Sequence, residues 1–498
     1  KAKIEYGEAA FYGIIIFHRS FAYKSTKICG VCGMVEILEK INRALWGVPL
    51  TALILFAGVF LTVATGFIQF RGFKKAFAGV FRKGTGVGVS PFAALCTSLS
   101  ATIGTGNIVG VTAAVVYGGA GALFWMILCA TLGMAVKFSE GFFAVKYRKT
   151  DAFGVPFGGP FLYMERGLSS RFPRAKKLPR AFAVFFALVC VVGAVTGLGT
   201  LVQSNGMALC VRGIAGAFGK EKSFSVFGAS VPLSVAVFAV VSTFLAAVII
   251  FGGLKGVSTF STVAVPVMAG VYIVLALCVI GCNLSALPAA VGRIFVGAFD
   301  PSAAVGGTVG YGISQTVRLG VSRGIFSNES GVGTAPIAIA CSDGKDPREQ
   351  GLVAMLGTFL DTHVICLLTG FAVLVTGADM PLSNGSKTLE AADLVTSAFT
   401  KGLAPVFGEN SPFGRVMLGV CLILFAFTTA VGWCFYGEQS LRYLCGKRRR
   451  FGLFLTLYRL AYISFVFLGA FVPVRAAWDA ADICNALMAF PNVITLLL

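Results

Sequence analysis

The chain has 498 residues, of which 57% are hydrophobic and only 12% are charged, and its mean hydropathy is +0.86. A soluble domain carries about twice that charged fraction, so the composition excludes a soluble protein and predicts an all-α polytopic membrane protein surrounded by a lipid bilayer. A formal net charge of +20 would suggest nucleic acid in a soluble protein. Here we attribute it to basic loops that set topology, and we predict no nucleic-acid partner.

Residues 1–33 are predicted to be a non-native or upstream N-terminal extension. Their apolar stretch "AAFYGIIIF" is too short to span a bilayer, and no small-residue cleavage site follows it. Met34 opens "MVEILEKINRALWGVP", which is typical of a natural start: an amphipathic lead-in followed by an interfacial Trp46. Residues 34–90 would hold this lead-in, one extra transmembrane helix and a basic cytoplasmic loop.

Apolar runs of roughly 20 residues predict about eleven membrane spans. They lie near 46–70, 91–117, 119–147, 181–209, 226–251, 260–283, 303–340, 351–377, 412–437, 452–473 and 478–498. The 303–340 stretch is too long and too broken for one simple helix. Fourteen cysteines, mostly in apolar segments, indicate small hydrophobes rather than a disulfide framework or a metal site.

Basic loops orient these spans. Three strongly basic stretches, within 71–83, 146–180 and 442–450, fall on one side when eleven crossings are counted. Because Lys and Arg accumulate in cytoplasmic loops, we predict a cell membrane protein (plasma or inner membrane) with its N-terminus outside and its C-terminus in the cytoplasm.

Two spans contain polar, glycine-rich interruptions. The first is "SATIGTGNIVG" (100–110), broken at Gly104-Thr105-Gly106-Asn107, and the second lies within 303–340. They are an odd number of crossings apart, which predicts a five-plus-five inverted repeat, with 91–283 as the first repeat and 303–498 as the second. The 46–70 span would lie outside it.

A helix break at mid-membrane is tolerated where it lines a cavity or binds a ligand. The half-helix that follows points its N–H groups and positive dipole end at an anion, while the preceding carbonyls suit a small cation. An amino acid together with a sodium ion would satisfy both. The alternative is that the glycines only allow close helix packing.

Long ordered motifs extend this pattern from Met34 to the end of the chain. They are "TSLSATIGTGNIVGV" (97–111), "GGAGALFWMILCATLGMAVKFSE" (118–140), "GGPFLYMERGL" (158–168), "VSRGIFSNESGVGTAPIA" (321–338), "GTFLDT" (357–362) and "GWCFYGE" (432–438). With these motifs the sequence strongly resembles the sodium:alanine (alanine or glycine:cation) symporter family. The resemblance implies a leucine-transporter-like fold with one extra N-terminal helix. It also implies sodium-coupled symport of alanine and/or glycine into the cell by alternating access, no enzyme activity, and no cofactor beyond the co-transported sodium ion.

The resemblance also implies a substrate site. Its residues would be Thr105, Gly106 and Asn107 in the first break, Gln203 in "LVQSN", Phe326 in "FSNE" and Trp433 in "GW". Taken from spacing alone, the two aromatic residues would be packing or lipid-facing side chains.

For sodium, the resemblance implies the backbone of Ala101 and Gly104 together with the hydroxyls of Thr428 and Thr429. The alternative for the two threonines is a hydrogen bond back to their own helix. Three positions depart from the usual family pattern: Ala93, Ile127 and Phe427. Of these, Phe427 adjoins the predicted sodium ligands.

Charged residues inside spans are functional candidates by default. Lys137 and Glu140 are expected to snorkel toward the cytoplasmic surface. Glu329 is expected to serve as a gate or scaffold, with contact to the substrate as the alternative. Asp361 and His363 share a span, but residues two apart point to different faces of a helix. We therefore expect no direct pair and an incidental role for His363.

Three other functions are alternatives to sodium symport. Proton coupling on the same scaffold would depend on Glu329, Asp361 and His363. A channel would need a continuous polar pore or rings of charge or carbonyls, and an enzyme would need a nucleophile with its base or a metal cluster. The sequence offers neither of these last two arrangements.

Overall fold

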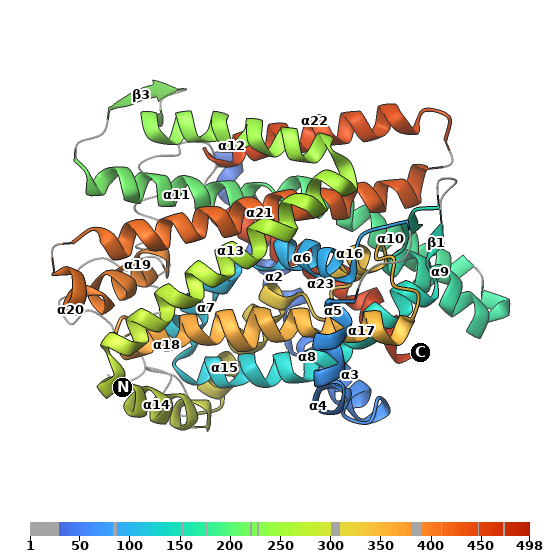
Figure 1. Cartoon of the computed structure of the whole chain (residues 1–498), viewed down its shortest axis with the longest axis horizontal. Coiled ribbons are helices and arrows are strands. Elements are labelled where there is room, and N and C mark those ends of the chain that lie inside the picture. Colours follow the sequence, from blue (N-terminus) through green and yellow to red (C-terminus); the bar gives the residue numbers. More distant parts are fainter. Residues whose placement is uncertain are drawn as a thin grey trace.

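Helices form almost all of the regular structure (Figure 1), because a segment that crosses hydrocarbon must satisfy its backbone hydrogen bonds internally. The computed structural model describes residues 29–82, 87–150, 154–175, 177–219, 222–226, 229–299, 309–379, 391–409, 411–446, 448–471 and 474–498. Most of the predicted extension 1–33 and the start of the predicted second repeat at 303 lie outside these residues.

The helices before residue 300 include the first predicted break. Their bounds are α2 (Cys29–Leu45), α3 (Val48–Ala64), α4 (Ile68–Arg71), α5 (Phe73–Val80), α6 (Pro91–Thr102), the π-helix η1 (Gly106–Gly110), α7 (Val111–Gly118), α8 (Gly121–Lys146), α9 (Pro160–Arg171), the 3-10 turn η2 (Pro173–Ala175), α10 (Lys177–Gly193), the π-helix η3 (Ala194–Leu198), α11 (Leu201–Ala217), α12 (Leu233–Phe251), α13 (Gly253–Cys282), the 3-10 turn η4 (Leu284–Ala286) and α14 (Leu287–Phe299).

The helices after residue 300 include the second break. They are α15 (Val309–Asn328), α16 (Ala335–Ile339), α17 (Pro347–Thr358), the π-helix η6 (Phe359–Cys366), α18 (Leu367–Val375), α19 (Ala391–Gly402), α20 (Ala404–Phe407), α21 (Phe413–Cys445), α22 (Phe451–Gly469) and α23 (Val474–Leu497).

Among the described residues, two short antiparallel hairpins join helices. In the first, β1 (Lys149–Thr150) pairs with β2 (Pro156–Phe157) so that Lys149 lies opposite Phe157. In the second, β3 (Ser223–Val226) pairs with β4 (Ala229–Pro232). The predicted start of a span at 226 is therefore wrong, since α12 begins only after the extended Pro232. An apolar run of this kind does not by itself distinguish a strand from a helix.

Within the described residues, nine helices are long and apolar enough to cross a membrane. The number is ten when α6 and the η1–α7 helix, which meet at a bend of 58°, count as one broken span. The prediction of many apolar spans is confirmed, whereas the count of eleven and the inverted repeat stay predictions. The helical run 177–217 is also longer than its predicted span of 181–209.

The packing of α12 shows how these helices fit a bilayer. Its buried positions follow helical spacing and are mostly small or medium in size: Val235, Ala239, Ser242, Ala246 and Ile250. Large apolar side chains such as Phe244 and Leu245 point outward, where hydrocarbon would contact them. Small residues also allow close contacts between helices: a Cβ on Gly121 of α8 would lie 2.1 Å from the Gly297 backbone of α14.

The connecting segments gather at the two ends of the long helices (Figure 1). Strand β3 and helices α14, α19 and α20 lie at one end, while β1, α9 and the C-terminus lie at the other. The basic 146–180 stretch thus shares an end with the C-terminus. The assignment of that end to the cytoplasm stays a prediction.

Candidate functional site

The first helix break is held by side chains from three elements. After α6 ends at Thr102, Ile103 leaves the helical conformation (φ −77°, ψ 94°). The Gly104 N–H donates to Asn107 Oδ1 (3.0 Å), and the Thr105 hydroxyl donates to Gln203 Oε1 of α11 (3.2 Å). A Cβ on Gly104 would lie 2.6 Å from Thr429 Oγ1 of α21, so only glycine fits between these groups.

The second break, between α15 and α16, has a left-handed backbone. Glu329 (φ 53°), Gly331 (φ 86°) and Gly333 (φ 93°) all have positive φ. A non-glycine residue in this conformation costs on the order of 1–3 kcal/mol and persists where its surroundings hold it. Here the Asn328 side chain accepts from the Ser330 N–H (2.9 Å), and the Thr334 hydroxyl donates to the Glu329 carboxylate.

The two breaks enclose one small polar cavity together with α11 and α21. Its lining residues are Ala101, Thr102, Gly104, Gly106, Leu198, Gln203, Phe326, Glu329, Thr429 and Trp433. Its volume of about 10 Å³ corresponds to roughly one water molecule. An amino acid therefore fits only after the walls move apart.

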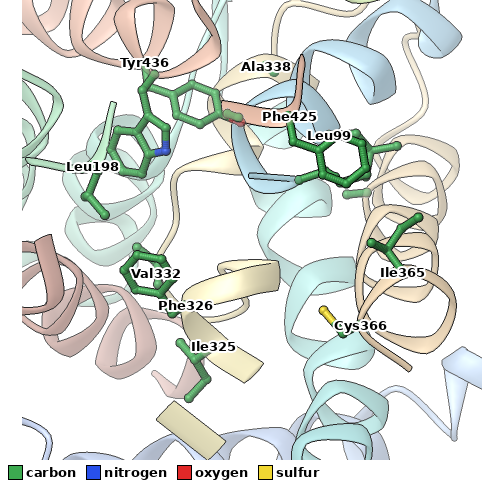
Figure 2. Close-up of a cluster of buried hydrophobic side chains, with 14 of the residues drawn as sticks. Leu99, Leu198, Ile325, Phe326, Val332, Ala338, Ile365, Cys366, Phe425 and Tyr436 are labelled. Atoms are coloured by element: carbon green, nitrogen blue, oxygen red, sulfur yellow. The ribbon is translucent and has the colours of Figure 1, made fainter. Parts of the chain in front are cut away.

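Most residues of the predicted sites meet in this cavity. The predicted substrate residues that line it are Gly106, Gln203, Phe326 and Trp433, and the predicted sodium ligands are Ala101, Gly104 and Thr429. Leu198 and Phe326 also belong to the buried apolar cluster in Figure 2, where Leu99 and Phe425 lie across the cluster from them. The sequence analysis missed Leu198, which ends the π-helix η3.

Thr105, Asn107 and Thr428 are buried beside the cavity but do not line it. Both ends of the Asn107 amide already have partners: Oδ1 accepts from Gly104, and Nδ2 donates to Asp361 Oδ1 (2.7 Å). A contact between Asn107 and a substrate stays a prediction, and it requires an exchange of partners.

The two threonines of α21 point in different directions. Thr429 Oγ1 lies 3.1 Å from the Ile103 carbonyl of the first break and 2.9 Å from the Phe425 carbonyl. Thr428 Oγ1 lies 2.9 Å from the same Phe425 carbonyl and 3.3 Å from Met268 Sδ, away from the cavity. The hydroxyl of Thr429 alone reaches the broken backbone.

Asp361 connects the two breaks through the α17–η6–α18 helix. Its Oδ1 accepts from Asn107 of the first break, and its Oδ2 accepts from Ser327 at the end of α15 (2.6 Å) and from Thr362 (2.8 Å). The side chain is 1% exposed, and these three hydrogen-bond partners are uncharged. The available sequence signal was an acidic residue within an apolar span.

The expectation that Lys137 and Glu140 snorkel is wrong. Their side chains are 2% and 0% exposed and form an ion pair of 3.3 Å, because α8 packs against α3, α15 and α17. Lys137 Nζ also donates to the Glu329 carbonyl (2.7 Å), and Glu140 accepts from the Gly331 N–H (3.1 Å). This pair therefore holds the left-handed loop of the second break.

His363 lies apart from this network. Its Nε2 is 2.9 Å from the Thr131 hydroxyl, and its ring stacks on Phe359 with a centroid distance of 5.4 Å. Asp361 binds different partners, as expected for residues two apart.

The cavity is closed toward the end of the bundle that holds α14 and α19. Arg323, one turn before Phe326 on α15, pairs with Asp482 of α23 (3.1 Å). The Phe326 ring packs on Trp478 with a centroid distance of 5.0 Å. Trp46, predicted to be interfacial, is buried instead and donates to the Asp482 carbonyl (2.9 Å).

The cavity is also closed toward the end that holds β1 and α9. The Arg148 guanidinium donates to three carbonyls after α16, those of Ala340 (3.2 Å), Ser342 (2.6 Å) and Gly344 (2.9 Å). Val89, just before α6, forms a parallel bridge with Ser342. These contacts join the ends of both broken helices.

Apolar helices that surround a closed polar cavity between two broken helices define a multi-pass membrane protein of the transporter class. Comparison with known proteins narrows this class. The chain belongs to the sodium:alanine symporter family, whose family model matches residues 32–498. This confirms the resemblance, and the family is one of transporters rather than enzymes.

Individual relatives cover nearly the whole chain. An uncharacterized transporter of Haemophilus influenzae is 44% identical over 93% of this chain and 93% of its own length. The sodium/alanine symporter AgcS of Methanococcus maripaludis is 38% identical over 93% of this chain and 94% of its own length. Among solved structures, MhsT in complex with L-phenylalanine is 14% identical, with a TM-score of 0.49 over 83% of this chain and 89% of its own.

Proposed function

We propose that this protein is a secondary active transporter that carries alanine and/or glycine into the cell together with Na⁺. The supporting observation is the single cavity lined by both helix breaks, in which polar groups and a small apolar wall meet. The family and the printed name of the sodium/alanine symporter relative support the substrate and the ion.

In this proposal, the two ends of the substrate bind to the two breaks. The carboxylate binds at the start of the η1–α7 helix near Gly106, where the N-terminal N–H groups and the helix dipole favour an anion. The side chain lies against Phe326, Trp433 and Leu198. The two aromatic rings and the isobutyl group of Leu198 leave little room for the substrate side chain. We therefore expect this side chain to be a methyl group or a hydrogen atom.

Sodium would bind beside the substrate at the end of α6. The carbonyls of Ala101 and Gly104 and the hydroxyl of Thr429 supply neutral oxygen ligands, as broken helices do for sodium in other transporters. Thr428 joins them only if its hydroxyl turns away from Met268.

Alternating access would open one end of the cavity at a time. Opening on the α14–α19 side separates Arg323 from Asp482. Opening on the α9 side breaks the hydrogen bonds from Arg148 to the carbonyls after α16. We place the α9 side in the cytoplasm of a cell membrane (plasma or inner membrane), with the N-terminus outside. Counting α15 and α16 as an eleventh, broken span gives two repeats, 91–283 and 303–498, after the extra helix α3.

The same fold coupled to protons is the second candidate. It is favoured by Asp361, a buried carboxylate whose three hydrogen-bond partners are uncharged. Such a group is costly to leave ionised without a compensating charge, so a bound proton would stabilise it.

Uptake by the full chain in liposomes separates these candidates. We expect labelled alanine and glycine to accumulate under an inward sodium gradient and not under a proton gradient alone. Accumulation driven by protons alone would transfer the coupling role to Asp361. Uptake of neither amino acid by folded protein would refute the substrate assignment.

A further inference from the structure

The wall of the cavity includes an acidic residue, Glu329. Glu329 is the only charged side chain among the described residues that line the cavity, and it is 3% exposed. The buried cation of this network is Lys137, which forms an ion pair with Glu140. Its ammonium group also donates a hydrogen bond to the backbone carbonyl of Glu329. Among the described residues, the cavity wall therefore contains one acidic residue and no basic one, although the charge of Lys137 also acts on the Glu329 carboxylate.

The backbone places Glu329 at a negative end of a helix. Glu329 directly follows Asn328, the last residue of α15, where unpaired carbonyls carry the negative end of the helix dipole. Across the cavity, the η1–α7 helix begins at Gly106 and presents its positive end. The two walls are thus polarised in opposite directions.

Glu329 is also fixed in place rather than free to turn outward. Its φ of 53° is held by Lys137 on the carbonyl and by the Thr334 hydroxyl on the carboxylate. A preorganised carboxylate loses little entropy on binding a cation. An ionised carboxylate in so little solvent is costly unless it is paired.

We propose that the Glu329 carboxylate is the counter-charge of the substrate's ammonium group. The inference rests on the proposed amino-acid transport and deepens it: the ligand is a zwitterion whose positive end lies at the second break and whose negative end lies at the first. Its amino group is then required for recognition rather than tolerated. This replaces the expectation that Glu329 acts only as a gate or scaffold.

The test compares two ligands that differ only at this group. L-Alanine and L-lactate compete for sodium-dependent binding of labelled alanine to the purified full chain; lactate carries a hydroxyl in place of the ammonium. A hydrogen bond between charged groups is worth about 10- to 100-fold in affinity. We therefore expect the wild-type protein to prefer alanine over lactate by at least about tenfold.

Glu329→Gln removes the charge and keeps an oxygen that accepts from Thr334. We expect this variant to lose about 10- to 100-fold in alanine affinity, to leave lactate nearly unchanged and so to bring the ratio close to one. Glu140→Gln is the matched control, because it neutralises a carboxylate that binds the same loop but does not line the cavity. It should weaken both ligands by the same factor and preserve the ratio.

Each outcome has a separate meaning. A wild-type protein that binds neither alanine nor glycine in sodium refutes the proposed function. If the wild type binds alanine, an unchanged ratio in Glu329→Gln overturns the inference. So does a variant that alters only the sodium concentration needed for binding, since its partner would then be the metal ion. Where Glu329→Gln does not fold, the wild-type ratio decides: a preference below about threefold overturns the inference.

Discussion

Replacing Lys137 by methionine tests how strongly the buried charges hold the second break. The substitution keeps most of the length of the side chain, but it leaves Glu140, which is 0% exposed, without its ion-pair partner at 3.3 Å. It also removes the donor to the Glu329 carbonyl at 2.7 Å. Removing one partner of a buried pair costs about 3–5 kcal/mol, whereas a solvated pair is worth at most about 1 kcal/mol.

We expect Lys137→Met to lower the unfolding temperature of the detergent-purified chain by roughly 3–10 °C. The double variant Lys137→Met/Glu140→Gln removes both charges, so its cost should fall short of the sum of the single variants by about 1–3 kcal/mol. Arg43→Met is the control, because it breaks an exposed helix pair with Glu39 (3.5 Å). Additive single effects, or a loss for Lys137→Met no larger than for Arg43→Met, would refute the reasoning.

Three further predictions concern transport. Thr429→Val should raise the sodium concentration for half-maximal uptake by about tenfold or more, because it removes a predicted ligand. Thr428→Val should change this concentration less than about threefold, because the Thr428 hydroxyl faces Met268. Equal effects would mean that both hydroxyls reach the ion. Asp361→Asn weakens the hydrogen bonds that connect Asn107 of the first break to Ser327 before the second break. Uptake should therefore fall about tenfold but still require sodium. Uptake that no longer depends on sodium would contradict this prediction. Arg148→Gln should weaken the hydrogen bonds that close the α9 side. An impermeant thiol reagent should then label the Ala101→Cys/Arg148→Gln variant several-fold faster than the Ala101→Cys variant with Arg148 intact. Unchanged labelling of the folded double variant would show that Arg148 does not control access.

The polar breaks could be predicted from the sequence because a glycine- and asparagine-containing interruption in an apolar run has few physical explanations. The residues 104–107 thus located the first wall of the cavity. The sequence could not show whether the helix face that carries a charged residue is covered by other helices, because the arrangement of the helices is not known from the sequence. Lys137 therefore resembled a snorkelling side chain, although α8 is covered by α17 and α15 on that face.

The roles of Asp361 and Leu198 depend on a feature that no periodicity indicates. Among the described residues, three helices contain π-helical segments: η1, η3 and η6. Each reaches the site: Gly106 of η1 and Leu198 of η3 line the cavity, and Asp361 of η6 binds Asn107 of η1. A π turn inserts an extra residue and so changes the direction of the side chains that follow, and such turns are frequent at functional sites.

The π segments η1 and η3 therefore lie in the walls of the cavity. A π segment replaces the i→i+4 hydrogen bonds of a regular α-helix by i→i+5 bonds, and sharp kinks in helices are often found at such segments. The cavity leaves room for roughly one water molecule, so its walls must separate before an amino acid enters. The contacts that close the two ends lie on other elements than the π segments, because Arg323 belongs to α15 and Arg148 follows α8.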